Sequence, residues 1–250
     1  MLFRSGKGDE MTPSAIERHK DSMRDVLLIC DLDGTLVDSY SGIKAALQEA
    51  LSAVDCSAAE PLDRWIVGPP LDELLRRAVG LTNPTTLAKA RQVFVEFYDH
   101  AACKQSEPFC GVKDMLDNLM DRGVKLGLAT NKRVKPTNAI LKANGWQSIF
   151  IDVQAVDSKA GHARTKSEML EDILRRNASA ASSSFYLGDT LADAVAAEEV
   201  SVPFVLAAWG ATPLSKAGAS FVAASPGAVL PYLANASRAF RDVRQAGLSP

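Results

Sequence analysis

The chain has 250 residues, of which 47% are hydrophobic and 23% are charged, and its formal net charge is −2. A chain of this length can bury one large core, or a core with a smaller inserted domain. The balanced charge provides no broad basic surface for nucleic acid or for an anionic membrane. The longest apolar runs have the length of strands, and none reaches the roughly 18 residues that a membrane-spanning helix needs.

The first residues are polar and partly basic. Residues 1–24 lack the apolar central region of a secretory signal, so we expect an N-terminal extension on a cytoplasmic protein. We expect a monomer or homodimer that binds neither nucleic acid nor a membrane.

From residue 25 onward, short apolar runs alternate with helical patterns, which indicates βαβ units and a mostly parallel sheet. We expect strands at residues 26–30, 124–129, 149–153, 184–187 and 202–207. We expect helices at residues 112–122, 135–144, 167–176 and 191–199. This alternation predicts the α/β fold class, with a doubly wound, mostly parallel sheet as in a Rossmann-like core.

The alternation is interrupted between residues 42 and 110, where the pattern becomes helical. Apolar residues recur at helical spacing in three stretches, residues 43–51, 71–79 and 93–98. We therefore expect residues 42–110 to form a helical cap domain. It would be inserted into an α/β core made of residues 25–41 and 111–250.

The first candidate functional motif follows the expected strand at residues 26–30. Asp31 and Asp33 emerge from this apolar run and are followed by Gly34. Buried carboxylates are costly unless a cation or hydrogen bonds offset them, and at the carboxyl end of a strand they usually serve chemistry. One carboxylate can attack phosphorus to form an aspartyl-phosphate, while the other protonates the leaving oxygen and then activates water.

A second acidic pair, Asp189 and Asp193, follows the expected strand at residues 184–187. Carboxylates spaced i and i+4 lie on one face of a helix. Close to Asp31 they would gather negative charge that only a hard cation can offset, and oxygen ligands beside a phosphate suit Mg²⁺. By itself this motif also suits helix capping by Asp189 or Thr190 with a solvated Asp193.

The run Asp31-Leu32-Asp33-Gly34-Thr35-Leu36-Val37-Asp38-Ser39 resembles the first signature of the haloacid dehalogenase-like hydrolases, and the helical insertion resembles their small cap. The resemblance extends from about residue 25 to about residue 235. It implies that Asp31 is the nucleophile and that Asp33 is the general acid and base. It also implies an Mg²⁺ site formed by Asp31, the main-chain carbonyl of Asp33, and Asp189, with Asp193 as a further ligand or as an orienting group.

Two weaker motifs fall in the order that the resemblance requires. Thr130 and Asn131 follow the expected strand at residues 124–129; a hydroxyl there can donate to a phosphate oxygen, although Thr-Asn is also ordinary turn chemistry. The resemblance assigns both residues to phosphate binding. Lys166 would supply the cation that holds the nucleophile beside the phosphoryl group. Lys159 is an alternative, because Ser167 stands where family members often have proline.

The sequence therefore predicts an Mg²⁺-dependent phosphatase, similar to the phosphoglycolate phosphatases, that hydrolyses a small phosphorylated metabolite through an aspartyl-phosphate. Two alternatives stay open: a nucleotidase or pyrophosphate hydrolase of the same family, and a catalytically silent protein that binds a phosphate ligand on this fold. Ile43 stands where a sugar-phosphate mutase of the family would carry a histidine, which argues against a mutase. Lys44, Arg64 and Arg76 are candidate substrate contacts in the cap, or solvated helix charges.

Overall fold

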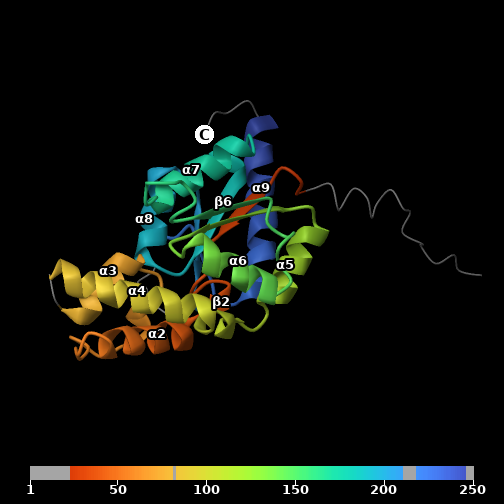
Figure 1. Cartoon of the computed structure of the whole chain (residues 1–250). Helices are drawn as coiled ribbons and strands as arrows, with labels where there is room; N and C mark the ends of the chain where they lie inside the picture. The colour runs from red at the N-terminus through yellow and green to blue at the C-terminus, as the bar shows by residue number, and fades with distance from the viewer. Residues whose placement is uncertain (1–22, 81–82, 211–217, 246–250) are drawn as a thin grey trace, which may run out of the picture.

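The computed structural model describes residues 23–80, 83–210 and 218–245 (Figure 1). In this part of the chain, six strands form one sheet in the order β5-β4-β1-β6-β7-β8, and all neighbouring strands are parallel. The strands are β1 (Leu27–Cys30), β4 (Lys125–Thr130), β5 (Asp152–Ala155), β6 (Ser184–Gly188), β7 (Phe204–Ala207) and β8 (Phe221–Ala223). The predicted α/β fold class is confirmed.

Helices cover both faces of the sheet, because successive side chains of a strand point to opposite faces. The even-numbered residues of β1 belong to a core shared with α5 (Val112–Asp121), α6 (Val134–Ala143) and α9 (Val229–Gln245). The odd-numbered residues of β1 pack with α7 (Lys166–Arg176) and α8 (Leu191–Glu199). Burial on both faces explains why β1 is apolar at every position.

The chain between β1 and β4 is mostly helical. It forms α2 (Tyr40–Ser52), η1 (Arg64–Ile66), α3 (Leu71–Val79), α4 (Pro84–His100) and η2 (Ala102–Gln105). Figure 1 shows α2, α3 and α4 as one group below the sheet. We call the segment from α2 to η2 the cap, and residues 42–110 stay our prediction for the limits of the inserted domain.

Two short strands connect this helical group with the sheet. β2 (Val37–Asp38) and β3 (Glu107–Pro108) pair antiparallel, so the outgoing and returning segments of the chain lie side by side. Such a paired connection fixes where the inserted helices stand relative to the end of β1. It places them over the carboxyl ends of the strands, where Asp31 follows β1.

The structure departs from the expected elements at the edges of the sheet. β5 begins at Asp152 rather than at residue 149, because Phe150 packs in the core and Ile151 is 51% exposed before the strand begins. The sequence pattern does not predict β2, β3 or β8, which are too short to show a period. It also misses α9, in which Pro231 looks like a turn signal. Two short 3₁₀ turns, η3 (Ala181–Ser183) and η4 (Pro226–Ala228), complete the described elements.

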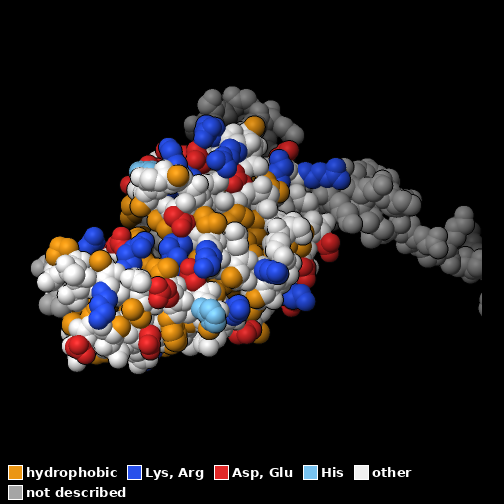
Figure 2. Space-filling model, viewed as in Figure 1, with side chains coloured by type: hydrophobic (Ala, Val, Ile, Leu, Met, Phe, Trp, Pro, Cys, Tyr) orange, Lys and Arg blue, Asp and Glu red, His pale blue; other side chains and the backbone are white. Residues whose placement is uncertain are grey.

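The N-terminal boundary also differs from the expected one. Met23 is buried, so packed residues extend into the segment 1–24 that we expected to be an extension. The rest of that segment, residues 1–22, lies outside the described residues. Within the described ranges, no helix combines the length and apolar character that crossing a bilayer demands. On the face shown in Figure 2, acidic and basic side chains are interspersed.

The packing of α9 on the sheet yields a first prediction. The ring of Phe185 in β6 is fully buried, and its centroid lies 5.9 Å from that of Tyr232 and 6.4 Å from that of Phe240. We expect Phe185→Ala to lower the free energy of unfolding by about 3–5 kcal/mol, because it leaves a cavity between β6 and α9. Urea denaturation followed by circular dichroism measures this change.

The matched control is Val195→Ala on α8, at a position that is 46% exposed. It should change the free energy of unfolding by less than about 0.5 kcal/mol. Equal effects of the two substitutions would contradict the packing of α9 against Phe185.

Candidate active site

The candidate residues converge because three parallel strands end at the same edge of the sheet. β1 is followed by Asp31, β4 ends at Thr130, and β6 is followed by Asp189. β1 lies between β4 and β6, so the sheet extends from β1 in both directions. At such a switch point the loops after neighbouring strands diverge and leave a crevice for a ligand.

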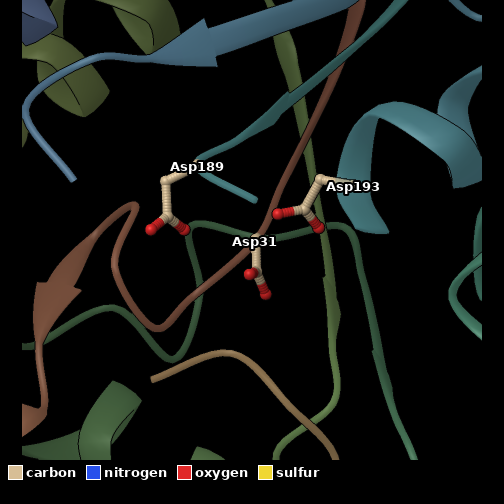
Figure 3. A group of neighbouring side chains, drawn as sticks. All are labelled: Asp31, Asp189 and Asp193. Carbon is tan, nitrogen blue, oxygen red and sulfur yellow. The ribbon is translucent and has the colours of Figure 1, made fainter. Parts of the chain in front are cut away.

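Three buried carboxylates form the centre of the site. Oxygen atoms of Asp31, Asp189 and Asp193 all lie within 4.8 Å of one another. Figure 3 shows Asp189 and Asp193 on either side of Asp31. We call these three residues the acidic cluster. The structure therefore brings Asp31 of the first acidic pair together with the second pair, which lies more than 150 positions further along the sequence.

Lys166 contacts two carboxylates of the acidic cluster. Its Nζ lies 2.9 Å from Oδ2 of Asp31 and donates to Oδ1 of Asp193 at 2.6 Å. Lys166 is the first residue of α7, whose N-terminus is fixed by a capping box between Thr165 and Glu168. The alternative, Lys159, is exposed in the segment before α7.

Asp193 uses both carboxylate oxygens within the protein. Its Oδ1 accepts from Lys166 and from the hydroxyl of Tyr186 at 2.7 Å. Its Oδ2 accepts from the main-chain N–H of Thr190 at 3.0 Å and from the hydroxyl of Thr190 at 2.6 Å. Burial raises the pKa of Asp193, but Lys166 and these hydrogen bonds outweigh burial and bring it below its usual value. The arrangement suits an orienting group that holds Lys166.

Asp31 and Asp189 have raised pKa values, in contrast to Asp193. Burial is the main cause that raises the pKa of Asp31 to about 7; Lys166 opposes this rise, whereas Asp193 and Asp33 add to it. Burial, followed by Asp193 and Asp31, raises the pKa of Asp189 well above its usual value, although Thr35 donates to Asp189 at 3.1 Å. The negative charge of the site therefore exceeds what Lys166 offsets.

The donor set fits a hard divalent cation. Oδ1 of Asp31 is buried and accepts no hydrogen bond from the described residues, a costly state for a carboxylate oxygen. Oxygen ligands from Asp31, Asp189 and nearby main-chain carbonyls are those that Mg²⁺ prefers. A bound cation would also remove the excess negative charge of the acidic cluster.

Glycines let the main chain close around Asp189. A Cβ atom added to Gly34, which has φ +79°, would lie 2.3 Å from Oδ2 of Asp189. A Cβ atom on Gly210 would lie 2.4 Å from Cβ of Asp189 and 2.4 Å from the carbonyl oxygen of Gly34. The sequence identifies Gly34 through its motif but gives no signal for Gly210, because Gly210 approaches the site only in the folded chain.

The side chain of Asp33 lies apart from the acidic cluster. Its Oδ1 forms an ion pair of 3.1 Å with Nζ of Lys132, which also donates to the hydroxyl of Tyr98 on α4. We did not expect a function for Lys132 from the sequence. The sequence signal that could have identified Lys132 is its position directly after Thr130-Asn131, at the end of a strand that reaches the site.

Residues 131, 132 and 133 contact the cap one after another. Asn131 donates from Nδ2 to the carbonyl oxygen of Gly68 at 3.0 Å, and Lys132 contacts Tyr98. Arg133 forms a two-point ion pair with Asp99 of α4, in which Nη1 donates to Oδ2 at 3.0 Å. Thr130, the neighbouring candidate, is buried and accepts from the N–H of Lys132 at 3.2 Å. We call residues 130–133 the 130–133 turn.

A small cavity of about 50 Å³ lies between the cap and the core. The core side of its lining includes Asp31, Asp33 and the 130–133 turn. The cap side is apolar and includes Ile43, Ile66, Leu71, Leu74 and Phe94. The candidate cap contacts Lys44, Arg64 and Arg76 do not line it; Arg64, for example, pairs with Asp38 at 2.7 Å.

Fold and site together define an α/β protein with a buried aspartate–lysine centre beneath a helical insertion. The chain belongs to the haloacid dehalogenase-like hydrolases, since the model of that family matches residues 28–207. The resemblance seen in the motifs is thereby confirmed.

Named relatives share most of the chain. The phosphoglycolate phosphatase of Vibrio parahaemolyticus is 29% identical over 225 residues, which cover 85% of this chain and 98% of the relative. That of Vibrio cholerae is 32% identical over 185 residues, or 70% of this chain and 81% of the relative. A protein of Mycobacterium tuberculosis named tyrosine-protein kinase PtkA is 31% identical over 188 residues, which cover 74% of this chain and 62% of that protein.

Solved structures show the same fold. A predicted phosphoglycolate phosphatase from Haemophilus somnus has a TM-score of 0.75 and 21% identity, and the match covers 84% of this chain and 98% of that one. A predicted phosphatase from Clostridium acetobutylicum has the same TM-score and 22% identity, with 84% and 98% covered. At these identities the likeness extends to the fold alone.

The raised pKa of Asp31 predicts how stability depends on pH and Mg²⁺. Because the folded protein keeps a proton on Asp31 that the unfolded chain releases near pH 4, the metal-free protein should lose stability as pH rises from about 4 through about 7. Mg²⁺ competes with that proton, so it should raise the melting temperature more at about pH 7.5 than at about pH 5.5. At a hundredfold excess over Kd the rise should be roughly 5–10 °C.

Thermal melts with EDTA or with Mg²⁺ at both pH values measure this effect. Asp189→Asn should abolish most of the Mg²⁺-induced rise, whereas the control Asp117→Asn, on the exposed side of α5, should retain it. An equal Mg²⁺-induced rise in melting temperature in the two variants would show that Mg²⁺ binds at another site.

Proposed function

We propose that the protein is an Mg²⁺-dependent phosphatase that hydrolyses a small phosphomonoester through an aspartyl-phosphate on Asp31. The observation that carries this proposal is the buried carboxylate of Asp31, held 2.9 Å from Lys166 at the edge of a cavity that Asp33 also lines. A fixed cation beside a carboxylate suits attack on a phosphoryl group, because the cation holds both negatively charged partners in place.

The reaction has two steps. A carboxylate oxygen of Asp31 attacks phosphorus, the bond from phosphorus to the leaving oxygen breaks, and Asp33 donates its proton to that oxygen. In the second step Asp33 takes a proton from water, and the water oxygen attacks the phosphorus of the aspartyl-phosphate. Phosphate is released and the carboxylate of Asp31 is restored. Thr130 and Lys166 would hold phosphoryl oxygens in both steps.

Mg²⁺ would be held by Asp31, Asp189 and the main-chain carbonyl of Asp33. When bound, it supplies positive charge that offsets the acidic cluster and the phosphoryl oxygens. Asp193 would act through Lys166, because its two oxygens already accept four hydrogen bonds within the protein. The sequence left two roles open for Asp193, metal ligand and orienting group, and we propose the second.

The cavity favours a small leaving group. A cavity of about 50 Å³ under an apolar cap wall leaves less room for the leaving group of a nucleotide than for one of the size of glycolate. The names of the Vibrio relatives support the same substrate class. Cytoplasmic location and a monomeric or homodimeric state stay predictions from the sequence.

The nucleophile is tested by Asp31→Asn. This change should lower Mg²⁺-dependent hydrolysis of p-nitrophenyl phosphate by at least about 10³-fold, because the amide cannot form the aspartyl-phosphate. The conservative control is again Asp117→Asn, which should keep wild-type activity. Retained activity in Asp31→Asn would make the assignment wrong, and a wild-type protein inert toward every phosphomonoester would favour the silent phosphate-binding alternative.

The substrate class is tested with a panel of phosphate esters. We expect kcat/KM for 2-phosphoglycolate and other small phosphomonoesters to exceed that for nucleoside monophosphates by about tenfold or more, since the larger esters must displace the cap wall. Steady-state phosphate release measures kcat/KM for both classes of ester. A preference for nucleotides or for pyrophosphate would support the nucleotidase or pyrophosphate hydrolase alternative instead.

A further inference from the structure

Lys132 is a second buried lysine of the site, besides Lys166, and the reaction outlined above does not use it. Only 5% of its side chain is exposed, and its Nζ lies 3.1 Å from Oδ1 of Asp33. The same Nζ donates to the hydroxyl of Tyr98 and lies 4.4 Å from the centroid of the Tyr98 ring. A buried ammonium group is costly unless it is paired, so these two partners fix the position of the lysine.

Each of the two lysines contacts a different aspartate of the first motif. Lys166 contacts Asp31 and is held from the core by Asp193. Lys132 contacts Asp33 and is held by Tyr98, which belongs to α4 of the cap. The nucleophile is therefore oriented by the core alone, whereas the acid is oriented through a residue of the cap.

Tyr98 is itself held firmly in the cap. It is 2% exposed, and its ring stacks on that of Phe94 with a centroid distance of 5.4 Å. Both aromatic residues and Lys132 line the cavity proposed for the leaving group. The hydroxyl of Tyr98 thus reaches Lys132 from a rigid support, as a positioning contact requires.

We propose that Lys132 is a positioning residue for Asp33, and that Tyr98 holds Lys132 so that the acid is aligned only when the cap is closed over the cavity. This inference rests on the proposed phosphatase function, in which Asp33 gives its proton to the leaving oxygen. It adds a cap residue to the control of proton transfer, which the first motif alone does not suggest.

Esters whose leaving groups differ in basicity distinguish the positioning of Asp33 from binding of the phosphoryl group. Departure of ethoxide, a strong base, needs a proton from Asp33, whereas p-nitrophenolate departs without one. The ratio kcat/KM reports the events up to departure of the leaving group, so it excludes the later hydrolysis that both esters share. A fault in the alignment of Asp33 therefore lowers kcat/KM for ethyl phosphate and spares p-nitrophenyl phosphate.

The experiment compares Lys132→Met and Tyr98→Phe in the full-length chain with Mg²⁺. Lys132→Met keeps an unbranched apolar stem without the ammonium group, and should lower kcat/KM about 10²-fold for ethyl phosphate and less than about 5-fold for p-nitrophenyl phosphate. Tyr98→Phe keeps the stacked ring and should lower only the value for ethyl phosphate, by about tenfold. Lys125→Met, at the exposed start of β4, is the control and should match the wild type.

Equal losses for the two esters in Lys132→Met would overturn the inference, because they would show that Lys132 binds the phosphoryl group common to both. Wild-type behaviour of Tyr98→Phe with ethyl phosphate would overturn the part assigned to the cap. If Lys132→Met does not fold, as judged by circular dichroism, Tyr98→Phe alone decides. Absence of Asp31-dependent hydrolysis in the wild type would overturn the phosphatase function as well, whereas intact hydrolysis with equal losses overturns this inference alone.

Discussion

The burial of negative charge is the constraint on which the rest of the site depends. Asp31, Asp189 and Asp193 lie where water is largely excluded, and carboxylates in such a place repel one another strongly. Lys166 offsets part of this repulsion because it contacts Asp31 and Asp193 together. The remaining imbalance is the charge that the proposed Mg²⁺ would offset, which would keep the carboxylate of Asp31 ionised for attack.

The fold meets this constraint by bringing charges together from distant parts of the chain. Parallel strands end at one edge, so the chain at the carboxyl ends of β1, β4 and β6 supplies carboxylate, hydroxyl and carboxylate in turn. The capping box at the start of α7 sets the direction in which Lys166 leaves the helix. Gly34 and Gly210 then allow the main chain to approach Asp189 more closely than any side chain would permit.

Much of this could be predicted from the sequence, because the relevant signals are local. An apolar run followed by Asp31 and Asp33 identifies a strand end, and the expected start of a helix favours Lys166 over the alternative Lys159. Other features depend on distant contacts and leave no local trace. The role of Lys132 depends on Tyr98, which is 34 positions away, and the amide of Asn131 is directed to Gly68 rather than left open in the cavity. The later start of β5 has a similar cause. Phe150 is apolar because it packs in the core before the strand begins, and its sequence pattern alone looks like part of the strand.

The 130–133 turn gives the site a property that no single contact possesses. Its last three residues hold Gly68, Tyr98 and Asp99 of the cap, while Thr130 begins the turn at the proposed phosphate position. Occupancy of that position and closure of the cap are then two equilibria linked through one short segment. Thermodynamic reciprocity requires that the factor by which closure strengthens phosphate binding equals the factor by which phosphate favours closure. The affinity for the product phosphate and the population of the closed state are consequently linked through the same coupling free energy.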